Sequence, residues 1–139
     1  MNEGLIIAII IGISIASVPL IFAAIGELLV ERSGVLNLGV EGMMIVGALA
    51  GFVVEFHTGS SFLAVLAALL AGMAIASIFA FLTQILLTNH VATGLALTLF
   101  GLGISAFVGR GYSEENIELI SALHIPVLSD LPIIGPLLF

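Results

Sequence analysis

The sequence predicts an all-α fold, a polytopic helical membrane protein with about four transmembrane helices. Of its 139 residues, 61% are hydrophobic and only 8% are charged, and the mean hydropathy is +1.39. Soluble domains are about 25% charged. In addition, no Asp, Glu, Lys or Arg occurs between residues 56 and 109. A soluble helical core would need a polar shell, and this chain has too few polar residues to form one.

Composition also excludes several classes of function. The absence of cysteine excludes disulfides, thiol catalysis and cysteine metal sites. The three histidines, His57, His90 and His124, are scattered rather than paired at ligand spacing, so we expect no metal and no cofactor. A net charge of −7 with only two arginines argues against nucleic acid as a partner. The sequence contains no phosphate-binding loop or dinucleotide fingerprint.

Three apolar runs are long enough to cross a bilayer, which takes about 20 helical residues. They cover residues 4–26, 62–87 and 91–109. Pro19 lies inside the first run, removes a backbone hydrogen bond there and predicts a kink. Ser61 and Asn89 stand just before the other two runs and are candidate N-caps. The polar stretches GELLVERSG, EFHTGSS and TNH separate the spans, so we expect short loops and antiparallel neighbours.

The remaining span, residues 34–54, is unusual. Its uninterrupted apolar part, from Gly42 to Val54, covers 13 residues and would be about 20 Å long as a helix. It crosses the membrane only if residues 33–41 are drawn in as well, which places Asn37 and Glu41 within or at the edge of the hydrocarbon. The alternative is an interfacial or re-entrant segment.

A carboxylate in that position needs an explanation, because an ionised side chain at mid-bilayer costs a few kcal/mol or more. Glu41 could start a helix, where the macrodipole contributes about 0.3–1 kcal/mol, or it could be neutral or paired with a group such as Arg32. A chain break at Gly39 and Gly42 would expose backbone groups to a solute or to water. In a helix, Asn37 and Glu41 share a face, and the functional hypothesis assigns both to a substrate path. The structural alternative is that Glu41 only begins the span near the headgroups, with Asn37 bonded to nearby backbone.

Small residues predict where the helices pack, because lipid provides no hydrophobic drive between them. The third span carries a small residue at every fourth position, namely Ala64, Ala68, Gly72, Ala76 and Ala80. The second span contributes Gly47 and Gly51. On the fourth span, Thr93 and Thr98 lie near one face, where their hydroxyls either line a wet path or bond back to their own helix.

After Gly109 the pattern changes. GYSEENIELISALH predicts a short amphipathic helix, and IPVLSDLPIIGPLLF follows with prolines that block a long regular helix. Composition leaves the orientation undecided, because the positive-inside rule has only Arg32 and Arg110 to count and four spans put them on opposite faces.

Three stretches carry a family resemblance. GELLVERSGVLNLGVEGMMIVGALAGF, residues 26–52, resembles the permease subunits of bacterial ABC importers in the inner-membrane translocator family, closest to the branch for nucleosides and simple sugars. NHVATGLALTLFGLGISAFVGRGY, residues 89–112, matches a second family stretch, with His90 where Gln is more usual. IPVLSDLPIIGPLLF resembles the segment after the fourth span. Family permeases are longer, so the chain resembles their amino-terminal half, and the resemblance implies that the cytoplasmic segment that docks on the ATPase belongs to the other half.

The resemblance implies a multi-pass permease in the bacterial inner or plasma membrane that moves nucleosides or related small polar solutes. The implied partners are a second permease subunit, ATP-binding subunits and an external solute-binding lipoprotein, with the lipid bilayer around the helices. ATP hydrolysis would occur in the partner, so the chain itself is not expected to be an enzyme. In this interpretation, Asn37 and Glu41 shape the gate of a passive path and Thr93 and Thr98 line it.

The resemblance also implies an orientation, in which the TNH turn and Arg32 are cytoplasmic and residues 110–139 form an external segment facing the receptor. Two alternatives remain open for the function. A branched-chain amino acid permease of the same superfamily has a similar pattern in this region. The second alternative is a small four-span structural or regulatory membrane protein, which would have the same composition and helix packing but would not transport a solute.

Overall fold

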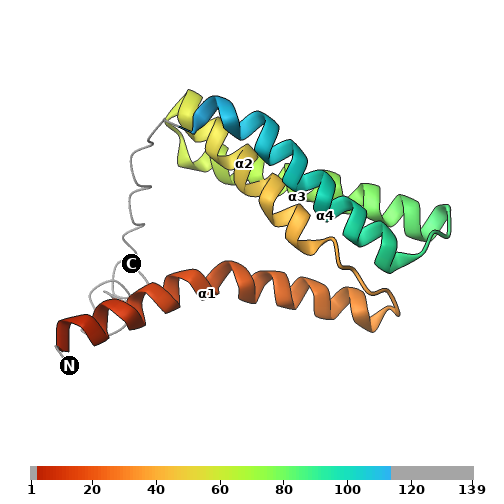
Figure 1. Cartoon of the computed structure of the whole chain (residues 1–139), viewed down its shortest axis with the longest axis horizontal. Coiled ribbons are helices and arrows are strands. Elements are labelled where there is room, and N and C mark those ends of the chain that lie inside the picture. The colour runs from red at the N-terminus through yellow and green to blue at the C-terminus, as the bar shows by residue number, and fades with distance from the viewer. Residues whose placement is uncertain (1–2, 114–139) are drawn as a thin grey trace. The chain divides into compact units, whose positions relative to one another are not determined.

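The structure, a computed structural model, describes residues 3–113, and every regular element in that range is helical. The elements, labelled as in Figure 1, are α1 (Glu3–Arg32), α2 (Val40–Thr58), α3 (Ser61–Ala80), the π-helical turn η1 (Phe81–Ile85), α4 (His90–Gly109) and the 3-10 turn η2 (Arg110–Tyr112). The predicted amphipathic helix and proline-rich stretch, and with them most of the external segment 110–139, lie outside the described residues.

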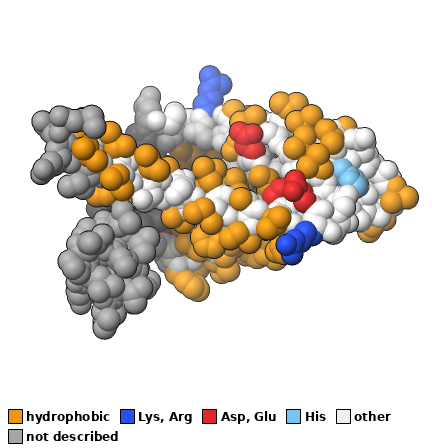
Figure 2. All heavy atoms as spheres, turned by 90° about the horizontal axis from the view of Figure 1, so that it is seen from below, with side chains coloured by type: hydrophobic (Ala, Val, Ile, Leu, Met, Phe, Trp, Pro, Cys, Tyr) orange, Lys and Arg blue, Asp and Glu red, His pale blue; other side chains and the backbone are white. Residues whose placement is uncertain are grey.

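Four helical stretches are long and apolar enough to cross a membrane. They are Ala8–Arg32, Val40–Thr58, Ser61–Ile85 and His90–Tyr112, with 19 to 25 residues each. Little of each stretch is buried within the fold, so most side chains are available to lipid. Figure 2 shows one face on which hydrophobic side chains are widespread and charged ones are few. The predicted all-α membrane fold is confirmed, and the chain is a multi-pass membrane protein.

The helix boundaries differ from the predicted spans at the first connection. α1 continues past Gly26 to Arg32, because the residues after Gly26 include good helix formers such as Leu and Glu. It ends where Gly34 adopts a positive φ of 84°, a conformation that favours glycine at helix C-termini. α2 then begins at Val40 rather than at residue 34 and continues to Thr58. Residues 33–39 are therefore not part of a helix.

The chain divides into two compact units whose boundary lies between Gly26 and Glu27. Residues 3–26 of α1 belong to one unit. Glu27 and the residues that follow it, through α2, α3 and α4, belong to the other. Pro19 lies inside α1, and the kink predicted there stays a prediction.

α2 and α3 pack antiparallel through small residues. A methyl group added at Gly47 would lie 3.2 Å from the carbonyl oxygen of Ala68, and one added at Gly51 would lie 3.3 Å from that of Ala64. Moving four residues forward along α2, from Gly47 to Gly51, moves the contact four residues back along α3, from Ala68 to Ala64, so the two helices run antiparallel. The two backbones approach closely because neither face carries a large side chain there.

The small-residue stripe of α3 is not equally buried along its length. Ala64 is buried, Gly72 and Ala76 are half-buried, and Ala80 is exposed. A methyl group added at Gly72 would still lie 3.9 Å from the carbonyl oxygen of Met43. The close part of the α2–α3 contact is therefore at the beginning of α3, and the stripe leaves it before α3 ends.

A small apolar core joins α3 and α4 to the connection between α1 and α2. Its buried members are Val35, Ile75, Phe79 and Leu97, with Val30, Met43 and Val46 packed against them. Val35 belongs to the non-helical residues before α2, so this connection packs into the core instead of lying outside it.

The turn between α3 and α4 has a regular helix start and an irregular helix end. α3 ends in η1, and Leu87 follows with a positive φ of 53°. Asn89 is the N-cap of α4, and its side chain accepts a hydrogen bond from the backbone N–H of Ala92 at 3.0 Å, which confirms that prediction. The prediction for Ser61 is wrong: Ser60 is the N-cap position of α3, and the Ser61 hydroxyl donates to Glu55 at 3.3 Å.

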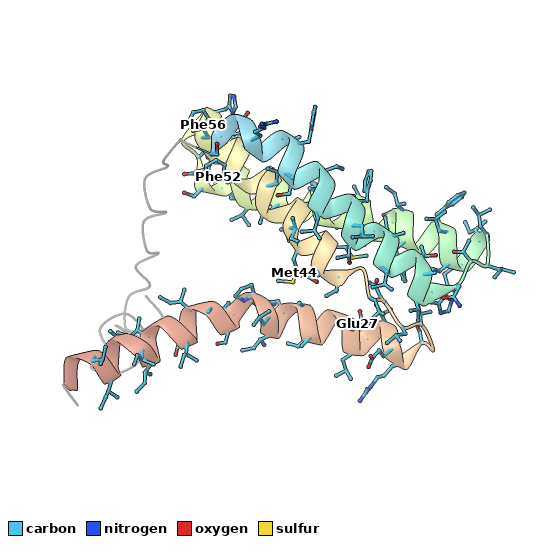
Figure 3. The ribbon with its side chains drawn as sticks, in the orientation of Figure 1. Glu27, Met44, Phe52 and Phe56 are labelled. Atoms are coloured by element: carbon cyan, nitrogen blue, oxygen red, sulfur yellow. The ribbon has the colours of Figure 1, made fainter. Side chains whose placement is uncertain are left out.

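An aromatic cluster lies where α2 and α4 both end. The ring of Tyr112 in η2 is 6.1 Å from that of Phe52 and 5.4 Å from that of Phe56, both edge-to-face, and it also contacts His57. Figure 3 labels Phe52 and Phe56 near this end of α2. The two helices therefore run parallel and begin at the same end of the bundle.

Candidate functional site

The candidate site is built around the connecting segment, residues 35–39, which leads into α2. Buried and exposed residues alternate along it: Val35, Asn37 and Gly39 are buried, whereas Leu36 and Leu38 are 42% and 41% exposed. The segment ends in a turn at Leu38 and Gly39, where Gly39 has a φ of −91° and a ψ of −2°. This non-helical backbone joins α1 to α2 and packs against the start of α4.

Three side chains satisfy backbone groups of the connecting segment. Glu27 Oε1 accepts a hydrogen bond from the N–H of Asn37 at 2.8 Å, and Asn37 Oδ1 accepts one from the N–H of Gly39 at 2.8 Å. Thr98 Oγ1 of α4 donates to the carbonyl oxygen of Leu38 at 2.9 Å. Non-helical backbone at membrane depth persists only where protein or water satisfies it. Figure 3 shows Glu27 near the end of α1, beside this segment.

Glycines let α4 lie directly against the connecting segment and the start of α2. A methyl group added at Gly94 would lie 2.7 Å from the backbone nitrogen of Leu38, and one added at Gly101 would lie 2.7 Å from the carbonyl oxygen of Gly42. In the other direction, a methyl group on Gly42 would lie 2.6 Å from the carbonyl oxygen of Leu97. Real Cβ atoms do not approach other atoms that closely, so only glycine fits at these positions.

Asn37 and Glu41, predicted to act together, have different surroundings. Asn37 is 7% exposed and bonds to local backbone, whereas Glu41 lies exposed in the first turn of α2. Because α2 begins at Val40, the two residues do not share a helix face. The start of α2 is a favourable place for a carboxylate, since the helix macrodipole is positive there.

The two threonines of α4 also separate. Thr98 contacts the connecting segment through its bond to Leu38, as described above. Thr93 lies one turn into α4, and its hydroxyl is 2.8 Å from that of Thr88 in the α3–α4 turn. The structure therefore brings Asn37 and Thr98 to one segment and leaves Thr93 at the turn.

Glu27 is the site residue that sequence reasoning missed. The sequence pattern predicts that the first span ends at Gly26, which places Glu27 in a polar loop. The available signal was that GELLVER consists largely of helix formers and places a glutamate next to an uncharged span. Because the helix continues to Arg32, the side chain of Glu27 lies beside the connecting segment and bonds to Asn37.

Among the described residues, no group of three or more His, Cys, Asp and Glu side chains could hold a metal ion. Between α1 and α2, the N–H groups of Asn37 and Gly39 and the carbonyl oxygen of Leu38 are each bonded to a side chain of the fold. Non-helical backbone next to membrane helices forms solute sites in transporters, and the fold here is that of a helical membrane protein.

The chain belongs to the family described as the branched-chain amino acid transport system / permease component, whose sequence profile matches residues 9–124. The resemblance to ABC permeases seen in the sequence is thereby confirmed. No solved structure matches the chain.

The chain is also similar to three curated ABC permeases. It is 44% identical over 128 residues to a putative glucose ABC transporter permease protein, TsgC13, of Haloferax volcanii, covering 89% of this chain and 39% of the relative. It is 33% identical to the nucleoside ABC transporter permease protein NupC of Lactococcus lactis (90% and 43%) and 32% identical to the guanosine ABC transporter permease protein NupQ of Bacillus subtilis (87% and 41%). The chain spans about two fifths of the length of these relatives.

Proposed function

We propose that the chain forms part of the permease of an ABC importer and that the solute is a nucleoside or a related small polar molecule. The observation that carries this proposal is the connecting segment, a non-helical stretch held by Glu27, Asn37 and Thr98 between apolar helices. The names of two relatives, a nucleoside and a guanosine permease, support the solute class.

In this proposal the chain is a passive path. Asn37 holds the connecting segment in shape, and the exposed Glu41 polarises the gate beside it. Thr98 lines the segment from α4, and Thr93 lines the turn at the same end of the bundle. ATP hydrolysis takes place in separate ATP-binding subunits, and a second permease subunit and an external solute-binding lipoprotein complete the importer. Arg32 faces the cytoplasm, and residues 110–139 face the lipoprotein.

A simple sugar is the second candidate solute. The 44% identity to a putative glucose permease favours it, and sugars and nucleosides share hydroxyl groups that bind backbone and amide partners. Branched-chain amino acids, named in the family description, carry a charged ammonium and carboxylate instead. The three solute classes therefore make different demands on one site and are tested side by side.

The test is uptake of radiolabelled guanosine, glucose and leucine by cells that carry the full-length permease with its partner subunits. We compare wild type with Asn37→Ala and Glu41→Gln at matched membrane levels. Asn37→Ala removes the acceptor for the N–H of Gly39, and Glu41→Gln removes a charge at the start of α2. We expect guanosine uptake in wild type and a loss of at least 10-fold in both variants.

Glu31→Gln is the matched control, because Glu31 is an exposed glutamate at the end of α1 and has no role in the proposal. It should transport at the wild-type rate. Normal uptake by both site variants would contradict the assignment of Asn37 and Glu41. Uptake of glucose or leucine without guanosine would move the solute to the corresponding class.

A further inference from the structure

Glu27 is the first residue of the compact unit that contains α2, α3 and α4. Its carboxylate is the only one in the described part of the chain that bonds to the connecting segment, through the 2.8 Å contact between Oε1 and the N–H of Asn37. The other oxygen, Oε2, is buried and has no hydrogen-bond partner among the described residues.

A carboxylate with one paired and one unpaired buried oxygen is a poor way to gain stability. Removing an oxygen from water costs free energy unless a donor replaces the water, and an apolar side chain of similar size would avoid that cost. Buried polar groups of this kind have a well-attested use in fixing position or register. The group that Glu27 fixes is the backbone at Asn37, at the centre of the connecting segment.

The contact also joins two parts of the fold that otherwise share few polar bonds. On one side is the C-terminal part of α1, where Glu27 lies between one and two turns before the end at Arg32. On the other is the connecting segment, which α4 already holds through Thr98. If the bond between Glu27 and Asn37 opens, the connecting segment keeps its bond to Thr98 of α4 and the bond from the N–H of Val35 to Val30 of α1, but the backbone at Asn37 is released from Glu27.

We propose that Glu27 is a positioning residue for transport, acting as a latch that sets the connecting segment through the N–H of Asn37. This inference rests on the function proposed above and adds a residue and a mechanism to it. The bond closes to place Asn37 and Leu38 against α4, and it opens when the segment moves during the transport cycle. Glu27 does not contact the solute.

The first measurement is the accessibility of a single cysteine at Leu36 or Leu38, the two exposed positions of the segment. It is made in the assembled importer, in a background without other cysteines; the described chain contributes none of its own. The probe is a thiol-reactive maleimide, and the readout is the labelling rate. Three variants are compared: Glu27→Leu, which removes the acceptor, Glu27→Asp, which keeps the charge and shortens the reach by one methylene, and Glu27→Gln, which keeps an oxygen acceptor at the same reach.

We expect Glu27→Leu and Glu27→Asp to change the labelling rate at Leu36 and Leu38 by at least three-fold, and Glu27→Gln to restore it. In uptake, Leu and Asp should lower the maximal rate by at least five-fold with little change in KM, because the solute contacts remain. Glu31→Leu, one turn further along α1 at an exposed position, should change neither readout.

A labelling rate and a maximal uptake rate in Glu27→Leu that both equal those of wild type would overturn the latch. So would Glu27→Asp behaving like wild type while Glu27→Gln fails, since charge rather than reach would then matter. If Glu27→Leu does not reach the membrane, the comparison of Glu27→Asp with Glu27→Gln still tests the latch. Labelling needs no solute, so a wild-type importer that moves no guanosine would refute the proposed function without affecting the test of the latch.

Discussion

At the scale of single residues, the backbones of α2 and α4 come into direct contact at two glycines. Gly42 and Gly101 face each other so closely that neither position has room for a methyl group. Gly103, two residues further along α4, is exposed and has nothing within 4 Å of the place a methyl group would occupy. The same helix thus contains one glycine that the packing requires and one that it does not.

We predict that Gly101→Ala destabilises the protein by about 1–3 kcal/mol, because the added methyl group overpacks the contact with Gly42. Gly103→Ala should be neutral or stabilise by about 0.5–1 kcal/mol, since alanine loses less backbone entropy than glycine in a helix. The measurement is the thermal unfolding midpoint of the purified full-length permease in detergent. Equal midpoints for the two variants would contradict the described α2–α4 contact.

Residue roles were predictable where they depend on local chemistry. Asn89 was identified as an N-cap because an amide oxygen just before a helix has one obvious donor to accept from. The role of Gly42 was not predictable, because its partner on α4 lies more than 50 positions away in the sequence. Glu27 was missed for a related reason: its partner Asn37 is reached only when α1 continues as a helix past Gly26.

At the scale of elements, the connecting segment explains why α2 starts late. Gly34 ends α1 with a positive φ, and side chains, not helix bonds, then satisfy the backbone around Asn37. Leu36 and Leu38 stay exposed while Val35 joins the core. The segment was predicted to be drawn into the membrane, and a break near Gly39 was one of the options. The structure has that break before Val40, whereas Gly42 lies within α2.

The α2–α3 contact makes a prediction with a built-in control. Ala68→Leu should push α2 and α3 apart, because Ala68 lies against Gly47 and Gly51 of α2. A methyl group added at Gly51 would lie 3.3 Å from the Cβ of Ala68, and one added at Gly47 would lie 3.2 Å from its carbonyl oxygen, so a larger side chain has no space there. We expect a loss of about 1–3 kcal/mol. Ala80→Leu, on the same stripe but exposed, should cost little.

The measurement for this pair is again the unfolding midpoint in detergent, at matched expression. If Ala80→Leu destabilises as much as Ala68→Leu, the stripe is used along its whole length by a neighbour. In that case the contact with α2 would not be what distinguishes the two alanines.

Span positions were predictable because the cost of placing charges in lipid is large and dominates the pattern. The end of the first helix was not predictable. Gly26 is followed by the charged residues Glu27 and Glu31, a pattern that is also typical of a polar loop. The small-residue stripe of α3 was visible in the sequence, but how far along it a partner lies depends on the crossing of two helices, which spacing alone does not set.

At the scale of the whole molecule, the described unit has two different ends. At one end, the connecting segment, Glu41 and the α3–α4 turn gather the polar groups of the candidate path. At the other, Tyr112 packs on Phe52 and Phe56. α2 and α4 run parallel from the first end to the second, and the connecting segment contacts the starts of both helices.

The central claim is that the connecting segment and the start of α2 border the solute path. The most direct test is solute protection of a single cysteine at Glu41 in the assembled importer, labelled with a maleimide in the presence of guanosine, glucose or leucine. We predict that guanosine slows labelling at Glu41→Cys by at least three-fold, and that Glu31→Cys reacts equally fast with or without any solute. Labelling at Glu41→Cys that no solute slows would contradict the claim.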